Sequence, residues 1–488
     1  MAKNLMIQGT MSGAGKSIIT AGLLRIFKQD GYRAAPFKSQ NMALNSFVTA
    51  DNREMGRAQV VQAIAAGAEP SSDMNPVLIK PMGDTLSQVI VNGHPVGNMK
   101  AREYYRKKKE LIPEIMNAYD RLSRDRDIIV IEGAGSPVEI NLRENDIVNM
   151  GLAEMLDAPV LLVGNIDPGG VFAQLLGTVN LLDQKERERV KGLIINKFRG
   201  DKSLLMPGLS MFKEYCSIPF AGVVPYTDLK LDEEDSVSER LQGKKTAAPK
   251  GGIEICVIKL PLISNYTDFS VLENIPSVNV AYTDDPKEIK DPDLLILPGT
   301  KNTLKDLKWL RDSGMEAALT EAVKRGVPLI GICGGFQMLG EAIEDRDGLE
   351  GGGSMKGLSL FPLKTVFSPE KTLRQTALST GRVEGEFSFL SDLRISGYEI
   401  HMGVTEGYGD HPGVTAGDNV LGTYIHGFFD SPELVRRLLT YLYQKRGDSV
   451  PDLQIEDPRD RTEKELDRLA DVLRENLDMD LIRGILSF

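Results

Sequence analysis

A cysteine held between glycines is the part of this chain that most directly suggests covalent chemistry. The segment GICGG places Cys333 between an apolar run, residues 327–332, and a helix-like segment, residues 336–342. This is the order of the G-x-S-x-G elbow of hydrolases, with sulfur in place of oxygen. The amide of Gly334 and the start of the helix could stabilise a negative oxygen beside the sulfur. Alternatively, Cys333 is a small buried hydrophobic residue, as most free cysteines are, and the segment alone does not decide.

A nucleophilic cysteine needs a base, and the chain offers four histidines. His426 ends an apolar and aromatic segment, residues 421–426, and is expected at the same sheet edge as Cys333. His401 lies in an alternating segment and could instead be structural or support the base. His94 and His411 lie in turn-like segments. We therefore favour His426 over His401 as the base.

A second glycine-containing loop could contribute to the same site. Residues 298–303 follow the predicted strand 294–297, and the backbone amide of Gly299 could complete an oxyanion hole with that of Gly334. The alternative is an ordinary turn into a helix, capped by Thr303.

The first residues of the chain predict a phosphate-binding loop. GTMSGAGKS, residues 9–17, follows an apolar segment and precedes a helical one, and the amides of such a loop can cradle phosphates. The strict motif has glycine where this chain has Thr10, and Gly9 comes one position earlier. That variant resembles the loop of dethiobiotin synthetase and its relatives. The residues expected to bind ATP are Gly13, Gly15, Lys16 and Ser17, with Ser17 also a magnesium ligand.

Short apolar segments that alternate with helical ones must position these residues. Such strands are typical of parallel sheets covered on both faces, which bind ligands at the carboxyl ends of their strands. We therefore predict an α/β protein with two doubly wound parallel-sheet domains. The predicted strands are residues 33–37, 128–131, 160–163, 192–195 and 220–224 in the first half, and 253–259, 278–282, 294–297 and 327–332 in the second.

Polar residues at the ends of the first set of strands give further candidates. Lys38 and the pair Asn196 and Lys197 could bind the nucleotide, although a turn would also explain the pair. Glu132 could be a second magnesium ligand, with a solvent-facing acid as the alternative. Asp51 and Glu54 could add a metal or substrate contact, but helix capping explains Asp51 nearly as well. Two polar residues could contact the substrate, Asp146 and Asn41, although a solvated loop explains Asp146 equally well.

A charged, then Lys-, Ala-, Pro- and Gly-rich run, residues 231–252, is the clearest linker. It separates a domain over residues 1–235, which carries the phosphate-binding loop, from a domain over 252–447, which carries Cys333, with a linker over 236–251. Residues 448–488 are a helical extension in which Leu466, Leu469, Leu473 and Leu477 recur at helical spacing. We interpret this extension as a docking or capping helix.

Composition excludes several classes of function. The 488 residues carry a formal charge of −11, which argues against nucleic acid as the main partner. No apolar run reaches the roughly 20 residues of a membrane span, and the N-terminus lacks a signal-peptide pattern, so we expect a cytoplasmic protein. Three widely spaced cysteines predict neither a disulfide framework nor a CxxC metal site. The oligomeric state stays open.

Nine segments in one order resemble the cobyric acid synthase family, the glutamine-dependent enzymes of cobalamin biosynthesis. The resemblance covers residues 1 to about 447. The segments are GTMSGAGKS (9–17), FKSQNMALNS (37–46), VIEGAGSPVEINL (130–142), GNIDPGGVFAQ (164–174), INKFRGD (195–201), LPGTKNT (297–303), GICGGFQMLG (331–340), GYEIHMG (397–403) and TYIHGFF (423–429).

The resemblance implies a dethiobiotin-synthetase-like P-loop domain followed by a class I glutamine amidotransferase-like domain. It implies ATP, Mg²⁺ and glutamine as reactants or cofactors, and a corrinoid substrate, adenosylcobyrinic acid a,c-diamide. The b, d, e and g carboxylates of that corrinoid would be amidated to give adenosylcobyric acid. The residues alone indicate only a phosphate-binding site together with a cysteine nucleophile. Amide transfer is a function that would use both.

One departure concerns the base. Many class I glutaminase domains carry His-Pro-Glu, in which the glutamate orients the histidine, whereas His426 is followed by Gly427 and Phe428. A two-residue Cys-His site is therefore the implied form, with Glu399 as a hypothetical third partner. Two alternative functions are the sister activity, amidation of carboxylates a and c, and a nucleotide-dependent switch with an inactive amidotransferase-like domain.

Overall fold

The computed structural model describes residues 2–83, 85–232, 251–407 and 413–487. His411 and the predicted linker, apart from Gly251, lie outside the described residues. Among the described helices, none is both long and apolar enough to cross a membrane.

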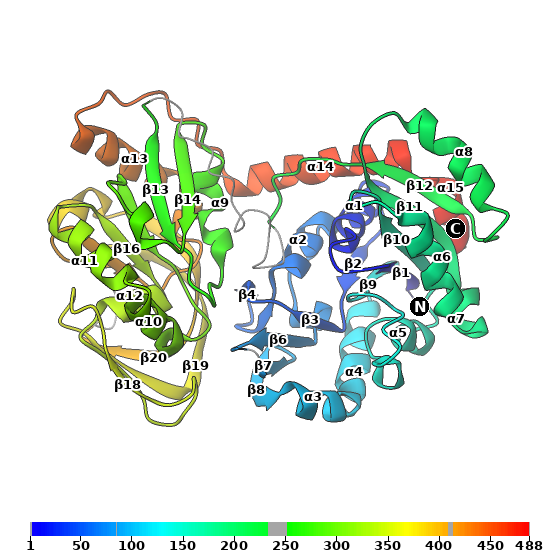
Figure 1. Cartoon of the computed structure of the whole chain (residues 1–488), viewed down its shortest axis with the longest axis horizontal. Coiled ribbons are helices and arrows are strands. Elements are labelled where there is room, and N and C mark those ends of the chain that lie inside the picture. The colour runs from blue at the N-terminus through cyan, green and yellow to red at the C-terminus, as the bar shows by residue number, and fades with distance from the viewer. Residues whose placement is uncertain (1, 84, 233–250, 408–412, 488) are drawn as a thin grey trace.

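A six-stranded parallel sheet forms the centre of the first domain (Figure 1). Its central strands contain apolar runs, such as residues 5–7, 128–131 and 160–163, that are fully buried, as expected for a sheet covered on both faces. In spatial order, the strands are β12 (Phe220–Pro225), β11 (Val190–Phe198), β10 (Val160–Asn165), β1 (Lys3–Gly9), β9 (Ile128–Glu132) and β2 (Ala34–Phe37). The helices of this domain are α1 (Lys16–Gln29), α2 (Arg57–Ala66), α3 (Ala101–Lys107), α4 (Ile112–Ser123), α5 (Met150–Met155), α6 (Val171–Leu181), α7 (Gln184–Arg189) and α8 (Lys202–Phe212).

The second domain is built on a sheet of the same kind, with one antiparallel edge strand. Its strands, in spatial order, are β14 (Val278–Thr283), β13 (Ile253–Ile258), β15 (Leu294–Leu297), β16 (Leu329–Ile332), β22 (Val420–Thr423) and β21 (Thr415–Ala416). Its helices are α9 (Ser270–Glu273), α10 (Thr303–Asp312), α11 (Met315–Lys324), α12 (Gly334–Leu339) and α13 (Pro432–Arg446). The predicted fold class, α/β with two parallel-sheet domains, is confirmed.

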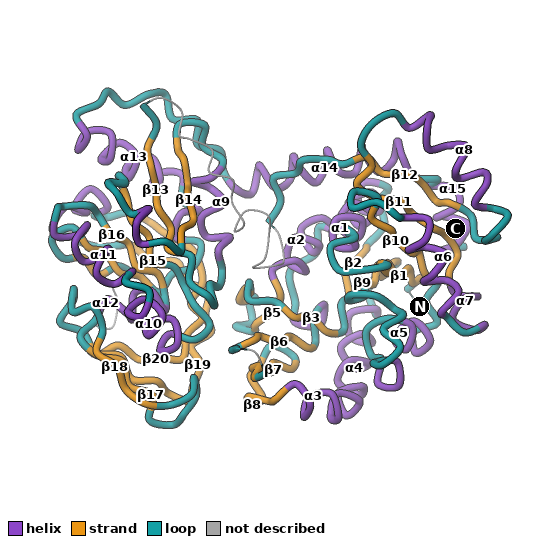
Figure 2. Tube along the Cα trace, in the orientation of Figure 1, coloured by secondary structure: helices purple, strands orange, loops and turns teal. Residues whose placement is uncertain are grey.

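Smaller sheets that the sequence did not predict lie where the two domains face each other (Figure 2). The first domain contributes the hairpin β4 (Ser46–Val48) and β5 (Glu54–Gly56), and the sheet of β3 (Gln40–Met42), β6 (Val77–Pro81), β7 (Leu86–Val91) and β8 (His94–Lys100). The second contributes β17 (Ala342–Asp345), β18 (Gly353–Lys356), β19 (Lys364–Ser379) and β20 (Arg394–Glu406). Val48 of the first domain packs with Tyr398 and Ile400 of the second in one buried cluster.

The C-terminal extension returns to the first domain. Helix α14 (Pro458–Asn476) runs from the second domain to the first, and α15 (Met479–Leu486) lies beside the first sheet, next to β12 (Figure 1). Leu466 and Leu473 are fully buried in the same core as the first sheet, and Leu477 pairs with Gly222 of β12. The predicted docking helix therefore completes the P-loop domain.

Candidate active sites

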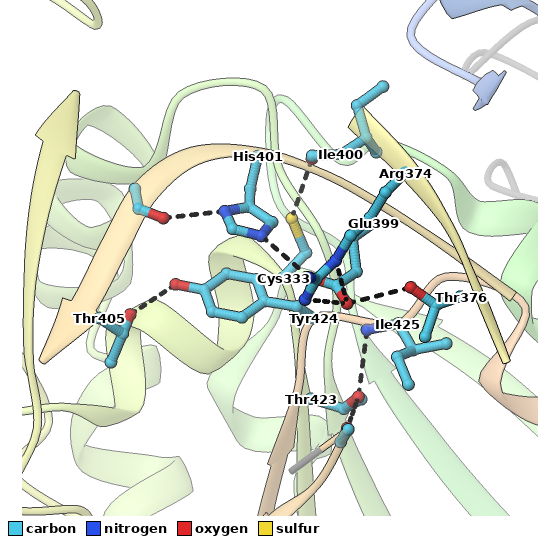
Figure 3. Close-up of polar contacts among 12 residues, drawn as sticks. Cys333, Arg374, Thr376, Glu399, Ile400, His401, Thr405, Thr423, Tyr424 and Ile425 are labelled. Carbon is cyan, nitrogen blue, oxygen red and sulfur yellow. Dashed lines mark hydrogen bonds and ion pairs between the residues drawn. The ribbon is translucent and has the colours of Figure 1, made fainter. Parts of the chain in front are cut away.

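Cys333 lies at the turn between β16 and α12. Its backbone adopts φ 51° and ψ −110°, a conformation that L-residues rarely adopt and that clusters at functional sites. The amide of Cys333 donates to the carbonyl of Thr423 at 2.8 Å, and Sγ lies 3.6 Å from the carbonyl oxygen of Ile400 (Figure 3). The turn thus fixes the sulfur at the carboxyl edge of the second sheet.

His426 lies beside this sulfur and is held by an aspartate. Nδ1 of His426 is 2.7 Å from Oδ2 of Asp268, and the other oxygen, Oδ1, accepts the amide of Gly427 at 2.9 Å. Burial opposes protonation of the imidazole, but the Asp268 carboxylate outweighs it and raises the His426 pKa to about 10. Interaction with the Cys333 sulfur acts in the same direction. Cys333, His426 and Asp268 therefore have the buried arrangement expected of a nucleophile, a base and an orienting acid.

Asp268 is the third partner that the sequence did not reveal. It lies in the single-turn helix η4 (Tyr266–Phe269), at the carboxyl side of β13, and is 4% exposed. The one feature of the sequence that could have indicated Asp268 is that it is an acid within an apolar and aromatic segment that follows a buried strand. The hypothesis that Glu399 orients His426 is wrong, because Glu399 binds Arg374, Thr376 and His401 instead (Figure 3).

His401 lies in the same pocket with a different set of contacts. Its ring stacks on Tyr424 with 3.8 Å between centroids, its Nδ1 is 2.8 Å from the carbonyl of Gly403, and Figure 3 shows it near Cys333. The carboxylate next to it, Glu399, is also bound by Arg374. These contacts fit a supporting role for His401 better than the role of base.

The two predicted oxyanion glycines lie close to the reacting groups. A side chain at Gly299 would meet Cε1 of His426 at 3.3 Å, and one at Gly334 would meet Cγ2 of Thr300 at 2.7 Å. The loop that carries Gly299 therefore packs against both the imidazole and the first residue of α12. The amide of Gly334 begins that helix and has no acceptor within it. Their backbone amides stay our candidates for the oxyanion hole.

A pocket surrounds Cys333 and draws its walls from both domains. It is lined by Lys80, Ser264, Asn265, Thr300, Lys301, Thr303, Cys333, Gly334, Gln337, Glu350, Phe367, Lys371, Ile400, His401 and Met402. All belong to the second domain except Lys80, which lies on β6 of the first. The nucleophile thus faces a space that borders the P-loop domain.

A buried ion cluster joins the domains at this pocket. Glu54 of β5 is fully buried and binds Lys80 at 2.9 Å and Lys371 of β19 at 2.5 Å. Burial alone would raise the Glu54 pKa, but the two ammonium groups hold it well below its usual range. Nearby, Ser46 accepts the phenol of Tyr398 on its carbonyl and donates its amide to Asn265.

The P-loop of the first domain has the backbone that phosphate binding requires. Gly13 and Gly15 have φ of 71° and 94°, and a side chain at Gly15 would meet Nδ2 of Asn196 at 2.0 Å. Asn196 donates from that atom to the carbonyl of Ala14, so it braces the loop. Nζ of Lys16 donates to the carbonyls of Met11 and Gly135, at 3.2 and 3.1 Å, and therefore lies across the loop.

The carboxylate of Glu132 binds two other residues that were predicted for this site, Ser17 and Lys38. Oε1 of Glu132 accepts Ser17 Oγ at 2.8 Å and Lys38 Nζ at 2.9 Å, and Oε2 accepts Gln62 of α2 at 2.5 Å. Burial would raise the Glu132 pKa, but Lys38 and the hydrogen bonds lower it. A hydroxyl and a carboxylate that meet at the N-terminus of α1 are the oxygen donors that Mg²⁺ prefers beside phosphates. This pair therefore fits a magnesium site.

Besides Glu54, four predicted residues do not join that cluster. Asp51 lies at the turn of the β4–β5 hairpin and binds Thr49 and Arg53. The Asp146 carboxylate accepts the backbone amides of Val148, Asn149 and Gly151, which caps α5. The other two are Asn41, which is buried and donates to Gln59, and Lys197, which follows Asn196 with φ 62°.

Comparison with known proteins covers the whole chain. Residues 5–237 match the CobQ/CobB/MinD/ParA nucleotide binding domain, and residues 254–434 match the CobB/CobQ-like glutamine amidotransferase domain. The chain is 53% identical to a cobyric acid synthase of Lachnoclostridium phytofermentans, over 100% of this chain and 99% of that protein. It is 51% identical to one of Ruminiclostridium cellulolyticum, over 100% and 98%.

Proposed function

This chain belongs to the cobyric acid synthase family, which carries out glutamine-dependent amidation in cobalamin biosynthesis, and we propose how its two sites divide that reaction. The second domain releases ammonia from glutamine at Cys333. The first domain uses ATP to activate the b, d, e and g carboxylates of adenosylcobyrinic acid a,c-diamide. The observation that carries this division is the Cys333, His426 and Asp268 arrangement, which lies in a pocket bordered by the P-loop domain.

Glutamine hydrolysis begins when His426 takes the Cys333 proton and the sulfur attacks the side-chain amide carbon of glutamine. The amides of Gly299 and Gly334 hold the resulting oxyanion. The imidazolium then returns its proton to the leaving nitrogen, the carbon–nitrogen bond breaks, and ammonia departs. Water, deprotonated by His426, cleaves the thioester to release glutamate and regenerate the thiol. Asp268 keeps the imidazole oriented and stabilises its charged form throughout.

Activation of the carboxylate takes place at the P-loop. A substrate carboxylate oxygen attacks the γ-phosphorus of ATP, which gives an acyl phosphate and ADP. Ammonia then attacks the acyl carbon and phosphate leaves, so that the carboxylate becomes an amide. Lys16 would exchange its two carbonyl contacts for phosphate oxygens, and the loop amides around Gly13 and Gly15 would bind the others.

Ser17 and Glu132 are the residues that would hold magnesium at this site. When bound, Mg²⁺ neutralises charge on the phosphate oxygens. Lys38 and Gln62 fix the Glu132 carboxylate and keep it oriented toward Ser17.

Counting amides by mass tests the substrate assignment. The protein is supplied with ATP, glutamine and either cobyrinic acid or its a,c-diamide, both as adenosyl corrinoids. We expect up to four stepwise decreases in mass on the a,c-diamide, one for each carboxyl OH replaced by NH₂. Two such decreases on cobyrinic acid and none on the a,c-diamide would instead assign the sister activity.

A further inference from the structure

A buried lysine whose amine has no hydrogen-bond or ion-pair partner among the described residues lies in the Cys333 pocket. Lys301 is 8% exposed and comes from the loop that also carries Gly299. In the described part of the chain, no hydrogen bond or ion pair reaches its Nζ. The other two lysines of the pocket, Lys80 and Lys371, are both paired with Glu54. A buried ammonium is costly to leave unpaired, so this position indicates an anionic ligand.

A carboxylate lies in the same pocket and is held in place by its own loop. Oε2 of Glu350 accepts the amide of Thr303 at 2.6 Å, and Asp345 accepts the amides of Leu349, Glu350 and Gly352. Burial raises the Glu350 pKa, and the nearby charge of Lys301 lowers it. The two groups are thus neighbours, yet no ion pair within 4.0 Å joins them in the described residues. Each group is therefore placed to pair with a complementary charge on a ligand in the same space.

The backbone group of glutamine carries the matching pair of charges, an α-carboxylate and an α-ammonium. We propose that Lys301 binds the α-carboxylate of glutamine and that Glu350 binds its α-ammonium, which directs the side-chain amide toward Cys333. Gln337 lines the same pocket and donates to Tyr424, so the lining includes a polar amide beside the charged groups. This assignment rests on the proposed release of ammonia from glutamine at Cys333.

Burial makes the charge of Lys301 sensitive to what occupies the pocket. Burial lowers the Lys301 pKa to about 7, and the charges of Lys371 and Lys80 act in the same direction as burial. A bound carboxylate would favour the ammonium form and offset part of that cost.

The test compares glutamine with an analogue that lacks one charge. 4-Aminobutanamide has the amide and the amine of glutamine but no carboxylate. We expect the unaltered protein to favour glutamine over it in kcat/KM for ammonia release by about 10- to 100-fold, the effect of one charge-assisted hydrogen bond. Lys301→Met should lower that preference to about one, mainly through the KM of glutamine. Lys308→Met, an exposed lysine of α10, is the matched control and should keep the preference.

Glu350→Gln gives the complementary experiment. Glutaramate keeps the carboxylate and lacks the amine, so the preference for glutamine over glutaramate should collapse in Glu350→Gln and persist in Lys301→Met. If neither the unaltered protein nor the variants hydrolyse the analogues measurably, the KM for glutamine tests the assignment instead. That KM should rise about tenfold or more in Lys301→Met and in Glu350→Gln.

The outcomes separate this inference from the proposed function. An unaltered KM and an unaltered preference in Lys301→Met would overturn the assignment of Lys301, provided that the unaltered protein hydrolyses glutamine. If the unaltered protein releases no glutamate, or Cys333→Ala releases it equally well, the proposed function itself fails. Amidation driven by ammonium reports that each variant is folded.

Discussion

The two buried sites of this molecule differ in how their charged side chains are partnered. Around Cys333, His426 is oriented by Asp268, and the base and nucleophile adjoin each other. At the P-loop, Ser17, Lys38 and Gln62 all bind the one carboxylate of Glu132, while Lys16 binds two backbone carbonyls. The first arrangement already has the geometry of a catalytic relay. The second must exchange contacts before its cations can bind phosphates.

The proposed cysteine site is thus held in its expected arrangement by contacts within the protein, whereas the cations of the proposed ATP site are bound to oxygens of the protein itself. The domains also touch directly behind the cysteine site. Tyr398 stacks on His426 with 5.4 Å between ring centroids, and its hydroxyl donates to the carbonyl of Ser46 in the first domain at 2.9 Å. Contacts at the domain boundary therefore reach His426, the proposed base.

The largest effect is expected from Lys16→Ala. Loss of its ammonium should remove the charge that stabilises the transferring phosphate, and lower amidation by more than about 10³-fold with either glutamine or ammonium. Amide formation on the corrinoid, followed by mass, is the measurement. Lys28→Ala, near the end of the same helix, should retain activity. Full amidation by Lys16→Ala would refute the assignment of the P-loop site.

Asp268→Asn should lower glutamine hydrolysis by about 10²- to 10³-fold, because the imidazole loses the charge that orients and stabilises it. Amidation with ammonium should change little. Glutamate release is the measurement, and a two- to threefold effect would mean that Cys333 and His426 act without an orienting acid.

The same variant should change the pH dependence of hydrolysis. The Asp268 carboxylate raises the His426 pKa to about 10, so its removal should lower that pKa. The imidazolium that protonates the leaving nitrogen would then be lost at lower pH. The alkaline limb of kcat/KM for glutamine should therefore move to lower pH in Asp268→Asn, and an unmoved limb would contradict this role.

Tyr398→Phe should give the smallest effect and tests the contact between the sites. It keeps the ring on His426 but removes the hydrogen bond to Ser46. We expect the glutamate released per amide formed to rise about two- to tenfold, as one buried hydrogen bond is lost. Tyr441→Phe, whose hydroxyl binds Glu386 within the second domain, is the control and should leave the ratio unchanged. A constant ratio in Tyr398→Phe would mean that this contact does not couple the sites.

Much of the fold could be predicted because its central strands are short apolar runs that differ sharply from their surroundings. Residues 294–297 were predicted as a strand and form β15 with the same ends. The strands at the domain boundary were missed because they are short or polar: β8, for example, is largely exposed. The sequence could not show that α14 packs against the first domain, since an amphipathic helix fits any complementary apolar surface.

The candidate sites were predicted where one segment carries the chemistry, as at the P-loop and at Cys333. Asp268 was missed because it is separated from His426 by 158 positions and has no flanking motif. Only the parallel sheet brings the ends of β13, β16 and β22 to one edge. Lys301 was overlooked for a related reason. Its proposed role follows from its burial and from the absence of a hydrogen-bond or ion-pair partner among the described residues, and no local sequence pattern predicts either.

The central claim is that ammonia made at Cys333 serves the ATP-dependent site of the first domain. The most direct test is amidation of the adenosyl a,c-diamide by Cys333→Ala, with ATP and either glutamine or a high concentration of ammonium. We predict no amide formation with glutamine and near-normal formation with ammonium. Normal amidation by this variant with glutamine, or failure of ammonium to restore activity in the folded variant, would contradict the claim.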